Sequence, residues 1–145
     1  MRYIENNWTL HAAFPDILYG TDVRQYAKFS EDDGVIVKRK TNPNEATIEA
    51  WGLVDGMPVS KHFKVLLYDD VVVQGSVTTP EMIQKTMTAL ELSYNLGTTG
   101  GVRRMAGTRY HFNDAYRTVI DRGTFKPREY PGRIGGTEDG ASIVW

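Results

Sequence analysis

The most apolar stretch of the chain is residues 63–68, Phe-Lys-Val-Leu-Leu-Tyr, and two aspartates, Asp69 and Asp70, follow it directly. Its apolar residues mostly follow one another and do not alternate with polar ones. This pattern is typical of a strand buried on both faces of a parallel sheet. We therefore predict that 63–68 is a central strand.

A helix is predicted after this strand. Residues 78–81, Thr-Thr-Pro-Glu, combine a Ser/Thr-x-x-Glu capping box with proline in the first turn. Apolar residues then recur every three or four positions, which predicts a helix with one face in the core. These residues are Met82, Ile83, Met87, Leu90 and Tyr94. Gly97 supplies the stop signal at the C-terminal end.

The next elements repeat the same order. Gly100-Gly101 punctuates the chain, and 102–106 is a short strand candidate. Asn113 and Asp114 can cap a second helix, which Gly123 closes. Strands and helices that alternate in this way indicate βαβ crossovers and a mostly parallel sheet. The predicted fold class is therefore α/β.

The first third of the chain gives weaker signals. Spacing of apolar residues predicts a helix at about 3–13, which Pro15 ends. A strand starts at 35–40, and 46–51 alternates apolar and polar residues on the other side of the turn signature Asn-Pro-Asn at 42–44. These two segments are predicted to form a β-hairpin.

Composition limits the kind of protein. A length of 145 residues suits one small domain, and 41% hydrophobic residues exclude wholesale disorder. The absence of cysteine excludes a disulfide framework, thiol catalysis and thiolate metal sites, and fits a reducing, cytosolic setting. No apolar run approaches the roughly 20 residues of a membrane span. The last segment, 124–145, is rich in glycine and proline, with a strand candidate at 141–145.

The formal charge of −1 argues against a dedicated nucleic-acid binder, but the charges are unevenly placed. Residues 103–133 hold eight basic residues, seven of them arginine, against three acidic ones. The planar arginine fork matches phosphate oxygens, so this segment is either a phosphate-facing surface or a solvated face with local ion pairs.

Candidate chemistry gathers where the predicted parallel strands end. In open α/β sheets, ligands bind at the carboxyl ends of the strands. Asp69 is suited to Mg²⁺, and Asp70 to orienting or deprotonating a water. Thr108 follows the next strand and is expected at the same rim, where it can meet a phosphate. Arg109 can pair with that phosphate, or with Asp114 or Glu129.

Several segments resemble the large terminase subunit of tailed bacteriophages. The most specific is 103–114, Arg-Arg-Met-Ala-Gly-Thr-Arg-Tyr-His-Phe-Asn-Asp. The resemblance covers nearly the whole chain, and its further segments are 14–18, 30–34, 45–52, 63–73, 76–82 and 95–98.

This resemblance implies one incomplete domain, 1–145, from a RecA-like, P-loop-type ATPase of a DNA-packaging motor, with the lid or linker region starting at 124. It implies Mg²⁺ and ATP as cofactors, with Asp69 as the Walker B acid that holds Mg²⁺ through water. It implies that Asp70 is the carboxylate that activates the attacking water, where much of the family has the longer glutamate. Gly107, Thr108 and Arg109 match the coupling motif near the γ-phosphate, and the 52–62 loop is expected near the site.

Partners and location follow from the same resemblance. The implied partners are double-stranded DNA, the portal protein, the small terminase subunit and other large-subunit copies in a ring, with no membrane. The implied location is the host cytoplasm.

One part of that machinery is missing from this sequence. A P-loop ends in Gly-Lys-Ser/Thr, and none of the fourteen glycines precedes a lysine. By resemblance the P-loop lies upstream of the matched region and the nuclease domain lies downstream. We therefore expect a fragment, with weak or no ATP binding by itself and no DNA cleavage.

Two alternatives remain open. The first is a non-catalytic terminase remnant that contacts DNA or intact subunits. The second is a metal-dependent nuclease that uses Asp69, Asp70 and Glu49 with two ions.

Overall fold

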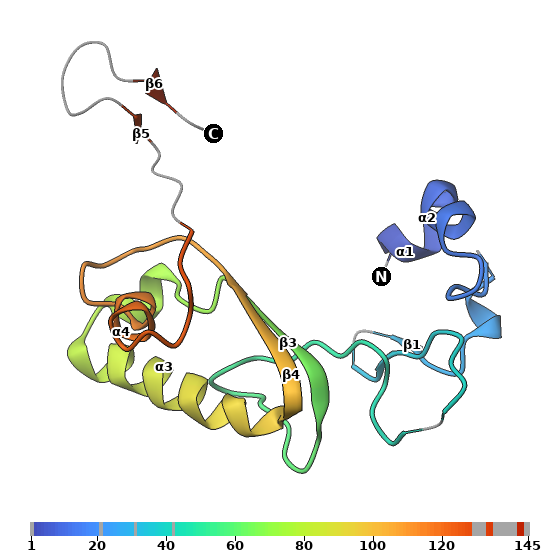
Figure 1. The fold of residues 1–145 in the computed structure, drawn as a ribbon, viewed down its shortest axis with the longest axis horizontal. Helices are drawn as coiled ribbons and strands as arrows, with labels where there is room; N and C mark the ends of the chain where they lie inside the picture. The colour runs from blue at the N-terminus through green and yellow to red at the C-terminus, as the bar shows by residue number, and fades with distance from the viewer. Residues whose placement is uncertain are drawn as a thin grey trace.

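A computed structural model describes residues 2–20, 22–30, 32–41 and 43–128, together with the backbone of 133–134 and 142–143. The protein is mixed α/β, with helices beside a small parallel sheet (Figure 1). The elements in chain order are α1 (Arg2–Asn6), α2 (Trp8–Ala13), the 3-10 helix η1 (Val23–Gln25), β1 (Phe29–Ser30), β2 (Gly34–Val35), β3 (Phe63–Asp69), η2 (Gln74–Val77), α3 (Pro80–Ser93), η3 (Tyr94–Leu96), β4 (Gly97–Ala106), α4 (Ala115–Asp121), β5 (Arg133–Ile134) and β6 (Ser142–Ile143).

The centre of the fold is the β3–α3–β4 unit. Strands β3 and β4 pair in parallel, from Val65 opposite Val102 to Asp69 opposite Ala106. Helix α3 makes the crossover, and Figure 1 shows it with α4 on one side of the two strands. The predicted order of strand, helix, strand and helix is confirmed. In the described residues the parallel sheet has two strands, and a complete RecA-like sheet is not shown.

Helices cover only one face of this sheet, so the prediction that 63–68 is buried on both faces is wrong. Leu66 and Tyr68 point toward the helices and join the core. Val65 is 58% exposed and Leu67 is 71% exposed, because successive side chains of a strand point to opposite faces. Among the described residues, no element covers that second face.

Both predicted helix starts have a physical cap. The Oγ1 atom of Thr79 accepts a hydrogen bond from the Met82 N–H at 3.3 Å, so α3 begins at Pro80, one residue later than a Thr78 cap would give. A carboxylate oxygen of Asp114 accepts from the Arg117 N–H at 3.0 Å and starts α4. Gly123, with φ of +65°, follows α4 as predicted.

The apolar stripe of α3 is only partly in the core. Ile83 is partly buried but is not one of the core residues. Met87 and Leu90 are buried and Tyr94 is partly buried, whereas Met82 is 38% exposed and lies outside the core. The main core consists of Tyr68, Val72, Met87, Leu90, Ala115, Tyr116 and Val119. It therefore draws on the end of β3 and on both helices.

Strand β4 starts at Gly97, five residues before the predicted start at 102, and Gly100-Gly101 lies inside it. Between the Phe63–Gly97 and Val65–Val102 pairs, β3 has one residue and β4 has four. The extra residues form a wide bulge, in which Gly100 adopts a φ of +72°. A Cβ at Gly101 would lie 2.9 Å from the Thr98 carbonyl oxygen and 3.0 Å from the Lys64 carbonyl oxygen, so glycine is required by this close approach.

The helix predicted at about 3–13 is present but is divided into two helices, α1 and α2. Asn7 separates α1 from α2 because its side chain accepts a hydrogen bond from the Leu10 N–H at 2.9 Å and caps α2. Helix α2 ends at Ala13, before Pro15, as predicted. In Figure 1 these helices and β1 lie at the other end of the molecule from α3 and α4.

The predicted hairpin between 35–40 and 46–51 is wrong except at one antiparallel bridge, which joins Val35 to Ile48. In this part of the chain, the antiparallel strand pair is β1 with β2. Beyond Val35, the Ile36 N–H donates to the Lys28 carbonyl and the Lys38 N–H donates to the Ile17 carbonyl. The Val37 N–H donates to the Thr47 hydroxyl and not to a backbone carbonyl of the predicted partner strand. A second core cluster lies here and contains Leu18, Tyr26, Val35 and Val37.

The C-terminal strand candidate at 141–145 is represented by β6, which pairs antiparallel with β5. The rest of that candidate, and most of the expected lid or linker from 124 onward, lies outside the described residues. No helix in the described part of the chain is long and apolar enough to cross a membrane.

The core assignment makes a testable prediction within one helix. Leu90 is fully buried and Leu92 is 53% exposed. Leu90→Ala is expected to lower the free energy of unfolding by about 2–5 kcal/mol, because it leaves a cavity. Leu92→Ala is the matched control and is expected to cost less than about 1 kcal/mol. Denaturant unfolding measures both, and equal losses would contradict the described core.

Candidate functional site

The carboxyl ends of β3 and β4 meet at one rim of the sheet. Asp69 is in register with Ala106, and the Asp70 N–H donates to the Ala106 carbonyl at 3.1 Å. The chain then continues from Ala106 into Gly107 and Thr108. The two strand ends that carry the predicted site residues are therefore adjacent, as the parallel topology required.

The chain turns sharply at Asp70. Its φ is +44°, in the left-handed region, which aspartate tolerates better than most non-glycine residues. Strand alternation would point Asp69 and Asp70 to opposite faces, but this turn ends the extended geometry. Both side chains are exposed at the rim. The two carboxylates are therefore open to solvent and to a ligand.

A metal at this rim would depend on few protein ligands. Within the described residues, no three His, Cys, Asp or Glu side chains gather closely enough to hold a metal ion. Mg²⁺ usually takes one or two carboxylates and completes its shell with water and phosphate oxygens. Asp69, with Asp70 beside it, fits that modest requirement but not a dedicated metal cage.

Gly107 is explained by packing against Tyr116. A Cβ at position 107 would lie 1.9 Å from the Tyr116 hydroxyl oxygen and 2.6 Å from the ring carbon that bears it. The same hydroxyl accepts from the Val72 N–H at 3.4 Å and donates to the Ala106 carbonyl at 3.5 Å. Tyr116 thus links the ends of both strands, and burial raises the pKa of its phenol.

Tyr116 was not among the site residues predicted from the sequence. Its side chain is buried in the main core. Its hydrogen bonds to the strand ends depend on how α4 packs against the sheet. No local signal in the sequence reports that packing.

Arg109 is held by its own loop. Its guanidinium lies 3.7 Å from a carboxylate oxygen of Asp114 and donates to the Phe112 carbonyl at 2.9 Å. Asp114 is fully buried and also caps α4, so this pair fixes the loop to the helix. The structure shows the Asp114 pairing that the sequence left open, whereas Glu129 lies outside the described residues. Thr108 remains an exposed side chain of the motif.

Other arginines of the basic segment also form local ion pairs. Arg117 pairs with Asp121 at 2.8 Å, and Arg122 contacts Glu91. These pairs match the interpretation of a solvated face for this part of the segment. Arg103 and Arg104, by contrast, have no ion pair among the described residues.

Glu49 is engaged away from Asp69 and Asp70. Only 4% of its side chain is exposed, and its carboxylate accepts from Lys61, from the Trp51 indole N–H at 3.0 Å and from the Ala46 N–H at 2.8 Å. The three carboxylates of the nuclease alternative therefore do not form a common cluster.

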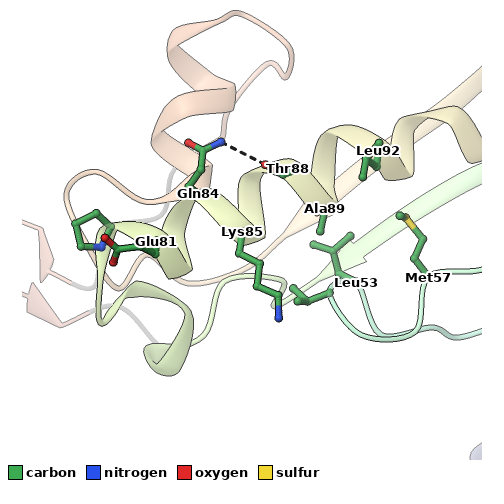
Figure 2. Close-up of a pocket in the computed structure, with 10 residues that line it drawn as sticks. Leu53, Met57, Glu81, Gln84, Lys85, Thr88, Ala89 and Leu92 are labelled. Carbon is green, nitrogen blue, oxygen red and sulfur yellow. Dashed lines mark hydrogen bonds between the residues drawn. The ribbon is translucent and has the colours of Figure 1, made fainter.

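A groove lies away from the rim, between α3 and the 53–57 segment. Its volume is about 730 Å³, and no rim residue lines it. Figure 2 shows Leu53 and Met57 on one side and Ala89 and Leu92 on the other. The 52–62 loop, which the resemblance placed near the nucleotide, thus packs along α3 here. None of the groove residues belongs to the predicted site.

Comparisons with protein-family models, curated proteins and solved structures find no match to this chain. These comparisons therefore give no information on the roles that the resemblance implies for Asp69, Asp70, Gly107, Thr108 and Arg109.

The contact between Gly107 and Tyr116 predicts a steric effect. Gly107→Ala is expected to lower the free energy of unfolding by about 1–3 kcal/mol, because the buried tyrosine ring has little space to move. Gly75→Ala is the matched control, since a Cβ at that position meets nothing within 4 Å. Denaturant unfolding compares the two variants, and an unchanged Gly107→Ala protein would contradict the contact.

We expect the free energy of unfolding to depend on pH through Glu49. Burial would raise the pKa of Glu49, but hydrogen bonds from Lys61, the Ala46 N–H and Trp51 outweigh burial and hold the pKa below its ordinary value. A lowered folded-state pKa stabilises the protein above the unfolded pKa of about 4.5, and this contribution is lost as the pH falls further.

The matched variant is Glu49→Gln, which keeps the side-chain shape and removes the charge. It is expected to cost about 1–2 kcal/mol at neutral pH. The difference from the unmodified protein should shrink as the pH falls below about 4.5. Thermal unfolding across pH measures it, and a difference that grows on acidification would show that the sign is wrong.

Proposed function

We propose that this chain supplies the Walker B and coupling-motif part of a terminase large-subunit ATPase, which uses ATP hydrolysis to move double-stranded DNA into a prohead. The observation that carries the proposal is the adjacency of Asp69 and Ala106 at the carboxyl rim of a parallel β3–α3–β4 unit. That topology brings the Asp-Asp pair and the Gly-Thr-Arg motif of the resemblance to one edge.

In this proposal, each rim residue has a different role in ATP hydrolysis. Bound Mg²⁺ would neutralise charge on the transferring phosphate. Asp69 would hold that ion through water, and Asp70 would accept a proton from the attacking water. The exposed Thr108 hydroxyl can donate to a phosphate oxygen. Arg109 acts as a positioning residue, because its pairing with Asp114 ties the motif to α4.

Motion would pass to the rest of the chain through the same contacts. Gly107 packs against Tyr116, and Arg109 is paired with Asp114. The motif therefore contacts the start of α4 at two points. A displacement of Thr108 would therefore be felt by α4. A coupling role at these residues would consist of this transmission of movement from Thr108 to α4.

A phosphate cradle must come from another polypeptide segment, since the sequence holds no Gly-Lys-Ser/Thr. The backbone donors and lysine of such a loop supply much of the positioning in phosphoryl transfer. The proposed partners and host-cytoplasmic location follow from the same resemblance.

Reconstitution with a P-loop tests this function. The chain is mixed with a separately expressed terminase segment that carries a P-loop, and phosphate release from ATP is measured. Turnover is expected only with both parts. Asp70→Asn should lower it about 100-fold or more, because the general base is lost. Asp16→Asn is the matched control, as Asp16 is an exposed carboxylate outside the rim.

A metal titration of the chain alone tests the assignment of Asp69 as the residue that holds the metal. Mn²⁺ is used as a paramagnetic probe, and it should broaden the amide signals near 69–70 and 106–108, with the effect lost in Asp69→Asn and kept in Asp16→Asn. No turnover in the mixture would favour the non-catalytic remnant. No broadening at the rim would contradict the assignment of Asp69.

A further inference from the structure

A second polar site lies at the opposite end of the sheet from the aspartates. The bulge of β4 encloses a pocket of about 290 Å³ beside the first residues of β3. Its polar walls come from Lys64, Arg103, Thr98, Thr99 and the backbone of Gly100-Gly101. This pocket is independent of the proposed nucleotide rim, because it lies where the strands begin.

The charges of this pocket are of one sign. Lys64 and Arg103 line it, no Asp or Glu does, and neither cation has an ion pair among the described residues. Most other arginines between 103 and 122 are paired with a carboxylate, as described above. Two unpaired cations around one cavity favour an anionic ligand.

Arg103 is positioned for this role. It is in register with Leu66 and so lies on the helix-covered face, where its guanidinium carbon is 4.7 Å from the centre of the Tyr94 ring. A stacked guanidinium keeps its N–H groups available at its edge. The fork geometry of these groups matches two oxygens of a phosphate.

The remaining walls supply neutral donors. Thr98 and Thr99 bring hydroxyl groups, and the left-handed Gly100 belongs to a turn in which backbone N–H groups can approach an anion closely. Tyr94, which also lines the pocket, has a buried hydroxyl without a hydrogen-bond partner among the described residues. Buried polar groups without partners are uncommon in proteins.

We propose that the Lys64–Arg103 pocket binds a phosphoryl group. The group can belong to a free phosphate ester or to the backbone of a nucleic acid, since both present the same oxygens. A carboxylate offers fewer oxygens and a smaller charge, so acetate is expected to bind more weakly than phosphate.

The test follows the backbone amide signals of residues 97–103 during titration with inorganic phosphate. Their shifts should saturate, and Arg103→Ala should weaken the affinity about tenfold. Arg104→Ala is the matched control. This substitution removes the same charge at the next residue, but Arg104 is in register with Leu67, on the open face of the sheet. Its effect should stay within about twofold.

A second variant and a second ligand show whether binding depends on this pocket and which source of phosphate it takes. Lys64→Gln should also weaken phosphate binding, by about threefold or more, and it covers the case in which Arg103→Ala does not fold. A short DNA duplex is then titrated against the same variants. Dependence of DNA binding on Arg103 but not Arg104 identifies a nucleic-acid backbone, whereas phosphate binding with DNA affinity insensitive to Arg103 identifies a free ester.

The proposal is overturned by either of two results. The first is that millimolar phosphate shifts no amide of the bulge. The second is that Arg103→Ala and Arg104→Ala weaken binding equally, which would show attraction to net charge without a site.

Discussion

The parallel pairing of β3 and β4 determines what the rest of the described structure can do. A parallel pair needs a crossover, and α3 provides it, so the strand ends that carry Asp69 and Gly107 meet at one rim. Tyr116 then fastens both strand ends to α4 through Val72 and Ala106. If this pairing were antiparallel, the aspartates and the Gly-Thr-Arg motif would lie at opposite ends.

Features with a local cause could be predicted from the sequence. Pro80 and Asp114 mark helix starts because their effects act within one turn, and Gly123 marks a helix end for the same reason. The meeting of the strand ends also followed, since it depends only on element order and the handedness of crossovers. The Asn7 cap, which breaks the first helix, acts locally as well, but the apolar spacing across it concealed the break.

Features that depend on distant packing could not be predicted. An apolar run such as 63–68 indicates that its residues are buried, but it does not indicate whether other elements cover one face of the strand or both. The open face of β3 was therefore not predicted. The Gly100-Gly101 pair suggested a turn, whereas its glycines accommodate a bulge against the Lys64 carbonyl. At the rim, a glycine that looked like part of a phosphate motif is required by the tertiary contact with Tyr116.

The two ends of the sheet therefore carry opposite charge. Asp69 and Asp70 lie at the carboxyl end. Lys64 lies near the amino end, and Arg103 lies opposite Leu66 in the middle of β3. At the usual rise of a strand, Lys64 lies about 16 Å along the chain from Asp69, and Leu66, the partner of Arg103, lies about 10 Å from it. Both separations exceed the screening length of about 8 Å at physiological salt, so salt reduces the repulsion between the carboxylates and an anion at the bulge. One end then suits a phosphate only together with a cation, whereas the other suits a phosphate alone. Because the ends differ in this way, occupancy of the rim should depend on divalent metal, while occupancy of the bulge should depend on ionic strength.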